Sequence, residues 1–302
     1  MGKVYEALNR AESKARQSDY TDIDFNYADI DVEDEREIRN ARDSRDERRF
    51  NFLRYSLGAT STFEKDRMKR DAATAGLVRR SQAQPAREVT VDFSRIDPHL
   101  AAFYNFDRSA TEQYNKLALT LISRAAERGF RRVLIASAHH GEGRTSVTLN
   151  LACALSRARQ RVLVVDCDLL QPSVMRMLGL DCEIGISEAF ASEMPPGAAA
   201  VRILPFGFNV LPTRKRVDNP VELLAAPGFW KMLQMFDADH DFILFDSSPL
   251  LAIGDSSLLA RFTDTTLMVV RSGRVSSAEM AKAILPFTQN DIFGVVINRA
   301  QG

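Results

Sequence analysis

The chain has 302 residues, of which 45% are hydrophobic, and its 40 basic and 40 acidic side chains cancel. This length can bury a large core, and the balanced charge gives no overall field that would draw the chain to nucleic acid or an anionic membrane. No apolar run approaches the roughly 20 residues of a membrane-spanning helix, and the N-terminus lacks an apolar signal-peptide core. We therefore expect a cytoplasmic protein that binds no nucleic acid and does not insert directly into a membrane. Only a partner would recruit it to the inner face of the membrane.

Residues 1–15 are predicted to form a short amphipathic helix, because Val4, Tyr5 and Leu8 fall on one helical face. A helix of this length is marginal alone, so both a frayed terminal helix and a docking helix remain open. Residues 16–96 are polar and densely charged, with both signs interspersed. This composition is typical of a solvated helix or a flexible linker rather than a nucleic-acid site.

Residues 97–302 are predicted to form one α/β domain. Short runs of Val, Ile and Leu alternate there with helical patterns, which predicts a parallel sheet with helices on both faces. The predicted strands are 132–136, 161–166, 208–211, 242–245, 265–270 and 293–298, and the predicted helices are 111–128, 146–158, 220–236, 255–261 and 277–287.

A glycine-rich loop, SAHHGEGRTS at residues 137–146, lies between the first of these strands and the next helix. Gly141 and Gly143 let backbone N–H groups approach phosphate oxygens, and the helix N-terminus adds partial positive charge. Thr145 is placed to offer its hydroxyl to Mg²⁺. The loop therefore predicts a phosphate-binding site.

Three aspartates follow predicted strands at the same edge of the sheet. Asp166 and Asp168 alternate on an extended backbone, so one is expected to face the phosphates while the other serves the structure. Asp246 follows a third strand, where a carboxylate can hold Mg²⁺ through water. A single strand-end aspartate is more often a helix cap or turn residue, but three strand ends converging beside a glycine loop favour a nucleotide site.

Together these motifs resemble the bacterial tyrosine autokinases of capsule and exopolysaccharide synthesis, which are P-loop ATPases of the deviant Walker A class. The resemblance covers roughly residues 95–300 and comprises five motifs in the family's order and spacing. The matching segments are Ser137–Ala152 (Walker A), Asp166–Pro172 (hydrophobic-D-x-D-L-R-R-P), Asp246–Pro249 (Walker B), Asp218–Leu233 (N-P-x-E-L-L) and Gly294–Ala300 (GVVINRA).

The resemblance implies a P-loop NTPase-like fold that binds ATP or ADP with Mg²⁺, and a membrane-embedded polysaccharide co-polymerase, or chain-length determinant, as partner. It places Asp166 and Arg144 as candidate catalytic residues and gives Asn298 the family's contact with adenine. The expected metal ligands are Thr145, Asp246 (directly or from the second shell) and Asp168. The expected nucleotide-binding residues are Gly141, Glu142, Gly143, Arg144, Thr145, Ser146 and Asn298.

The departures from the family pattern concentrate on the chemistry. Arg144 stands where the Walker A motif has lysine. Its planar, forked guanidinium can still contact phosphate, but it cannot reproduce the compact lysine charge between the β- and γ-phosphates. His139 and His140 replace the usual x-Pro and are interpreted as solvent-facing loop residues or as partly cationic groups beside phosphate.

Other departures concern assembly and the phosphoacceptor. Leu170 and Gln171 replace two arginines, and Asn115 and Ala118 occupy positions that are arginine in ring-forming relatives, so ring assembly through that helix is doubtful although a homo-oligomer stays possible. All six tyrosines precede the glycine loop, and no tyrosine cluster ends the sequence.

Three functions remain open on this basis. The first is a nucleotide-binding, kinase-deficient component of polysaccharide export with a regulatory or scaffolding role. The second is an active autokinase that phosphorylates N-terminal tyrosines such as Tyr5, Tyr20 or Tyr27. The third is a partition- or Min-like positioning ATPase, which would want a second lysine early in the loop, and none is present.

Overall fold

The computed structural model describes residues 86–104, 108–252, 256–285, 287 and 292–299. The predicted helix at 1–15, residues 16–85 of the predicted linker, and the candidate phosphoacceptors Tyr5, Tyr20 and Tyr27 lie outside the described residues. None of the helices in the described part has the length and apolar character that crossing a bilayer requires.

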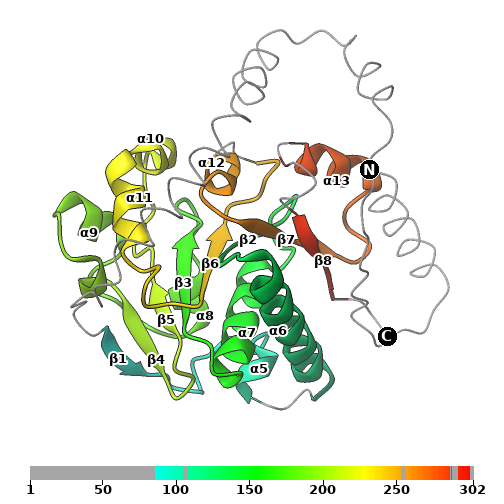
Figure 1. The fold of residues 1–302 in the computed structure, drawn as a ribbon, viewed down its shortest axis with the longest axis horizontal. Coiled ribbons are helices and arrows are strands. Elements are labelled where there is room, and N and C mark those ends of the chain that lie inside the picture. The colour runs from blue at the N-terminus through cyan, green and yellow to red at the C-terminus, as the bar shows by residue number, and fades with distance from the viewer. Residues whose placement is uncertain (1–85, 105–107, 253–255, 286, 288–291, 300–302) are drawn as a thin grey trace, which may run out of the picture.

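A single eight-stranded sheet forms the centre of the domain, in the order β1-β4-β5-β3-β6-β2-β7-β8 (Figure 1). The predicted parallel α/β sheet is confirmed, except that β4 and β5 pair in antiparallel fashion. Gly207, with a φ of +84°, lies in the turn that reverses the chain between those two strands. The strands are β1 (Arg87–Thr90), β2 (Arg132–Ala136), β3 (Val162–Cys167), β4 (Val201–Leu204), β5 (Asn209–Leu211), β6 (Phe242–Ser247), β7 (Thr265–Arg271) and β8 (Ile292–Asn298).

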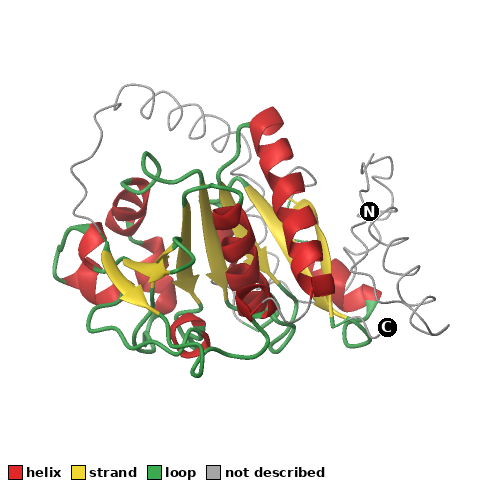
Figure 2. Cartoon of the chain, turned by 90° about the horizontal axis from the view of Figure 1, so that it is seen from below, coloured by secondary structure: helices red, strands yellow, loops and turns green. Residues whose placement is uncertain are grey.

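Helices cover both faces of this sheet, as predicted (Figure 2). Alternate residues of β2 show the division: Val133 and Ile135 join the core beneath α5, α6 and α7, whereas Leu134 and Ala136 join the core beneath α9 to α13. The helices are α5 (Ala101–Tyr104), α6 (Arg108–Arg128), α7 (Arg144–Arg157), α8 (Val174–Met177), α9 (Ile186–Ala191), α10 (Pro220–Ala225), α11 (Pro227–Gln234), α12 (Ser256–Ala260) and α13 (Ser277–Ile284), with a 3₁₀ turn at Pro196–Ala198.

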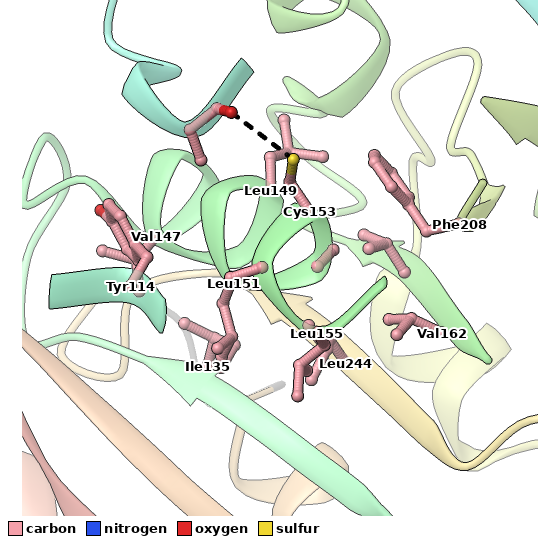
Figure 3. Close-up of a cluster of buried hydrophobic side chains, with 14 of the residues drawn as sticks. Tyr114, Ile135, Val147, Leu149, Leu151, Cys153, Leu155, Val162, Phe208 and Leu244 are labelled. Atoms are coloured by element: carbon pink, nitrogen blue, oxygen red, sulfur yellow. Dashed lines mark hydrogen bonds between the residues drawn. The ribbon is translucent and has the colours of Figure 1, made fainter. Parts of the chain in front are cut away.

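Helix α7, which follows the glycine loop, is largely enclosed, and ten of its fourteen residues are buried (Figure 3). Its Leu149, Leu151 and Leu155 are fully buried in the hydrophobic core. Cys153 is also buried: its Sγ donates to the carbonyl of Ala102 at 3.7 Å, and burial raises the pKa of its thiol to about 11. The glycine loop is therefore attached to a helix that the core holds in place.

Two predicted boundaries need correction. The predicted linker extends to residue 96, but β1 pairs with β4, and Val91 and Ile96 are buried in the core. The folded domain thus reaches back at least to residue 86. The predicted helix at 220–236 is two helices, because Pro227 lacks the N–H that a continuous helix would need and instead begins α11.

Candidate nucleotide-binding site

The glycine loop and the strand-end aspartates meet at one edge of the sheet. Strand β6 lies between β2 and β3, so the loop that leaves β2 is beside the ends of both. Asp246 is paired with Ile135 of β2 on one side and with Asp166 of β3 on the other. The predicted convergence of Asp166, Asp246 and the loop at the carboxyl edge is present in the structure.

The backbone of the loop has the form that anion binding requires. Gly141 and Gly143 have φ values of +77° and +95°, a region that glycine enters without strain. Gly143 is the N-cap of α7 and offers no side chain to cap it. Among the described residues, none accepts a hydrogen bond from the backbone N–H of Gly141, Gly143 or Arg144. These donors remain available to phosphate oxygens.

Gly143 is also required by a close neighbour. A Cβ built there would lie 2.0 Å from Asn298 Nδ2, whereas a Cβ on Gly129, which has a similar φ of +71°, would meet nothing within 4 Å. We expect Gly143→Ala to lower the free energy of unfolding by roughly 2–3 kcal/mol, and Gly129→Ala by only about 1 kcal/mol. Urea denaturation of the two variants measures the difference.

The effect of the clash between the added Cβ at position 143 and Asn298 can be measured separately by making the same substitution in an Asn298→Ala protein. In an Asn298→Ala protein the clash disappears, and Gly143→Ala should then cost no more than Gly129→Ala. If Gly143→Ala costs as little as Gly129→Ala with Asn298 present, the close approach described here is wrong.

Thr145, in the first turn of α7, contacts the end of β6. Its hydroxyl donates to Asp246 Oδ2 at 2.6 Å, and Thr148 Oγ1, one turn later, is 3.4 Å from the other oxygen of the same carboxylate. A second hydroxyl, that of Ser173 just before α8, lies 2.8 Å from Thr145 Oγ1. Oxygen groups from three elements therefore meet at this point, and such groups are the ligands that Mg²⁺ prefers.

The carboxylate of Asp246 is fully buried beside that of Asp166. Burial raises the pKa of Asp246 to about 6, and the nearby charge of Arg144 and the hydroxyl of Thr145 oppose the rise. The pKa of Asp166 is raised well above its ordinary value, first by burial and then by the negative charge of Asp246. A positive charge brought to this edge of the sheet would relieve both effects.

Asp166 is engaged by the backbone around it. One carboxylate oxygen accepts from Asp168 N at 3.3 Å, and the other accepts from Val174 N at 3.2 Å. Thr213 Oγ1 donates to the carbonyl of Asp166 at 2.6 Å. These contacts give Asp166 a role in fixing the chain after β3, while a catalytic role for it stays a prediction.

Arg144 points into the protein. Its Nε donates to Ser247 O at 2.8 Å, and one terminal nitrogen donates to both Ser137 Oγ (2.5 Å) and His139 O (3.0 Å). The other terminal nitrogen is 3.4 Å from Asp168 Oδ2. The side chain is only 7% exposed. The guanidinium thus ties the loop to the ends of β3 and β6 instead of extending toward the unpartnered N–H groups of the loop.

Asp168 is held by the same arrangement. Its Oδ2 faces Arg144, and its Oδ1 accepts from Gln171 N at 3.1 Å. Burial raises the pKa of Asp168, and the charge of Arg144 opposes that rise. Both carboxylate oxygens are therefore engaged by the protein, which leaves Thr145 and Asp246 as the better-placed oxygen donors for a cation.

The two loop histidines differ in surroundings. His140 is exposed, whereas His139 is half-buried and its Nε2 lies 3.1 Å from Glu279 Oε1 on α13. Glu142, which lies between the two glycines of the loop, is buried, and its carboxylate accepts a hydrogen bond from His139 N at 3.0 Å. Among the described residues, no group of three or more His, Cys, Asp and Glu side chains is arranged to hold a metal ion.

The remaining predicted ligands make protein contacts in this structure. Asn298 Nδ2 donates to Glu142 O at 2.8 Å, so this side chain supports the loop, and its contact with adenine stays a prediction. Ser146 Oγ donates to His99 O at 3.1 Å and thus binds the segment before α5. Buried Asn150 on α7 binds that segment too, because its Nδ2 donates to His99 O at 3.1 Å, and its Oδ1 accepts from Ala102 N of α5 at 2.8 Å.

Three residues of this site, Ser173, Ser247 and Asn150, are not among the predicted site residues. Ser247 contributes a backbone carbonyl, which carries no side-chain signal. Asn150 lies inside the N-L-A part of the Walker A match, and its polarity on an otherwise apolar helix was an available signal. Ser173 follows the proline of the second motif and carried none.

The comparisons with known proteins agree with this geometry. A sequence model of the ParA family, described as "NUBPL iron-transfer P-loop NTPase", matches residues 130–301, more than half of the chain. Tyrosine-protein kinase YwqD of Bacillus subtilis (strain 168) is 26% identical over 207 residues, which cover 68% of this chain and 87% of YwqD. Tyrosine-protein kinase wzc of Salmonella typhi is 31% identical over 158 residues, covering 52% of this chain but only 22% of wzc. The solved kinase domain of Escherichia coli tyrosine kinase ETK has a TM-score of 0.62 at 26% identity, covering 68% of this chain and 82% of that domain.

The glycine loop, the Thr145–Asp246 contact and these matches together define a P-loop NTPase, and the chain belongs to the ParA family of such proteins. The relatives named above are bacterial tyrosine kinases, which confirms the resemblance drawn from the five sequence motifs. The words "iron transfer" describe the family model and are not a statement about this chain.

Proposed function

We propose that this chain binds ATP or ADP with Mg²⁺ in the loop between β2 and α7. The observation that carries the proposal is the 2.6 Å contact of Thr145 with Asp246, beside a glycine loop in which the backbone N–H groups of Gly141, Gly143 and Arg144 have no acceptor among the described residues. Oxygen donors and N–H donors thus lie where the cation and the phosphates of one nucleotide need them. Bound Mg²⁺ would neutralise phosphate charge and hold the phosphate oxygens in place.

In this proposal each residue has a limited task. Gly141 and Gly143 bring N–H groups to the phosphates, and Thr145 with Asp246 holds the cation, Asp246 directly or through water. Asn298 supports the loop through Glu142 O and, by resemblance to the family, also contacts adenine. Asp168 serves chiefly as the partner of Arg144.

We further propose that phosphoryl transfer is impaired. A lysine at position 144 would place a compact charge between the β- and γ-phosphates. The guanidinium of Arg144 instead donates to Ser247 O, Ser137 Oγ and His139 O and faces Asp168. Bringing it to the phosphates would break these contacts and leave the buried Ser137 Oγ and Ser247 O without this donor, at a cost of about 1–3 kcal/mol each.

A nucleotide-binding subunit without efficient transfer is suited to a regulatory or scaffolding role. We propose that it acts in exopolysaccharide or capsule export, on a membrane-embedded co-polymerase that recruits it to the inner face of the membrane. The resemblance to the autokinases of that process supports this. Ala118, at a position that is arginine in ring-forming relatives, is buried on α6, which supports an assembly other than that ring.

Calorimetric titration of the full chain tests nucleotide binding. With excess Mg²⁺, ADP and ATP should each give saturable heat with one site per chain, and Thr145→Ala should weaken binding by tenfold or more. Thr263→Ala, which removes a half-buried hydroxyl that donates to Ala260 O, is the matched control and should bind as the wild type does. A folded wild-type sample that gives no heat with either nucleotide would refute the proposal.

A further inference from the structure

Ser173 occupies a position where serine ordinarily caps a helix, but it does not do so here. It is the N-cap of α8 (Val174–Met177), yet its side chain makes no capping hydrogen bond. The backbone N–H of Val174, the first residue of the helix, donates to Asp166 Oδ2 at 3.2 Å. Helix capping, the usual reason for a serine at this position, therefore does not account for the hydroxyl of Ser173.

The hydroxyl is directed to the cation site. Ser173 Oγ lies 2.8 Å from Thr145 Oγ1, whose own proton is given to Asp246 Oδ2 at 2.6 Å. Because a threonine hydroxyl has only one proton, the proton of the Thr145–Ser173 contact must come from Ser173. Thr145 Oγ1 then accepts one hydrogen bond and donates another, and keeps one unused lone pair.

The placement of Ser173 is fixed from both sides. The carboxylate of Asp166 holds Asp168 N before the turn and Val174 N after it. Within the turn, Asp168 Oδ1 accepts from Gln171 N at 3.1 Å. Two buried carboxylates thus shape the six-residue segment that brings Ser173, 28 residues away in sequence, onto Thr145.

We propose that Ser173 is a positioning residue of the cation site: it fixes the rotation of the Thr145 hydroxyl so that the one free lone pair is left for a divalent cation. This inference rests on the proposed function, because the cation is the one that arrives with the nucleotide. Ser173 acts through Thr145 and needs no contact with the nucleotide itself.

The test compares the dissociation constant of ADP in excess Mg²⁺ with that in EDTA, by calorimetry on the full chain. For Ser173→Ala we expect the gain in affinity from Mg²⁺ to fall about tenfold, while the dissociation constant in EDTA stays within about twofold of the wild type. Ser173→Thr, which keeps the hydroxyl, should restore most of the gain. Ser173→Cys, a poor donor of similar size, should behave like alanine.

Ser156→Ala is the matched control. Its hydroxyl is also half-buried but donates to Phe206 O at 2.8 Å, at the far end of α7, and the variant should match the wild type in both media. An unchanged Mg²⁺ effect in Ser173→Ala and Ser173→Cys overturns this inference alone, and so does an equal loss of affinity in both media, which would indicate a purely structural role. If the wild type binds no ADP in either medium, the proposed function fails and this inference fails with it.

Discussion

Replacing Arg144 with alanine is expected to lower the free energy of unfolding by about 3–5 kcal/mol. The substitution leaves the buried carboxylate of Asp168 without its charged partner. It also removes the guanidinium donor from the buried hydroxyl of Ser137 and from the carbonyl of Ser247, whereas the carbonyl of His139 keeps the Ser137 hydroxyl as a donor at 2.9 Å. For a domain of this size the loss corresponds to a fall in melting temperature of roughly 10 °C.

The control for this variant is Arg161→Ala. Arg161 also forms a forked contact with a carboxylate, that of Asp241 at 2.7 and 3.1 Å, but its side chain is 58% exposed. An exposed pair of this kind contributes at most about 1 kcal/mol. Denaturant unfolding of both variants makes the comparison, and equal losses would show that the Arg144 contacts do not stabilise the loop.

Asp246→Asn is expected to act in opposite directions on stability and on binding. Because burial raises the pKa of Asp246 from 3.8 to about 6, keeping it ionised in the folded protein costs roughly 3 kcal/mol at pH 7.5. Asparagine removes this cost while it still offers an oxygen to Thr145. The free energy of unfolding should therefore rise by up to about 3 kcal/mol, while affinity for Mg²⁺-nucleotide falls by tenfold or more.

The dependence of this gain on pH follows from the sign of the pKa shift. A raised pKa in the folded state means that the native protein binds more protons than the unfolded chain between about pH 4 and 6. The contribution of Asp246 to wild-type stability therefore declines as pH rises through that window and is constant above it. The advantage of Asp246→Asn should be full at pH 7.5 and should shrink toward pH 4.

Urea unfolding at pH 7.5 and pH 4.5 measures this change, with Asp218→Asn, which alters an exposed carboxylate, as the control. A destabilised Asp246→Asn protein at pH 7.5 would contradict the account of Asp246 as a strained, buried carboxylate. An unchanged affinity for Mg²⁺-ADP would contradict its place in the cation site.

The interior strands of the fold could be predicted because each is buried on both faces and reads as a continuous apolar run. Strand β3 (Val162–Cys167) and strand β6 (Phe242–Ser247) are examples. The edge strand β1 (Arg87–Thr90) was not predicted, because its exposed face is polar and its four residues resemble the preceding linker. Strand β4 was missed for the same reason, since its exposed residues alternate with buried ones.

The composition of the site was also readable from the sequence, but the directions of its side chains were not. Glycine spacing and strand-end aspartates located the loop, Thr145 and Asp246 on one edge of the sheet. The inward course of Arg144 depends on acceptors from three separate elements, including the backbone carbonyl of Ser247. The contact of Ser173 with Thr145 depends on how Asp166 holds the turn before α8. Such contacts arise only once the chain has folded.

The most direct test of the central claim, that the site holds nucleotide while Arg144 limits transfer, is the ATP turnover rate of Arg144→Lys beside that of the wild type. Both proteins should be prepared identically, with Asp246→Ala as the background control. We expect the wild type to bind Mg²⁺-ATP with little turnover and the lysine variant to hydrolyse it at least tenfold faster. Equal rates in two proteins that bind Mg²⁺-ATP equally well would contradict it.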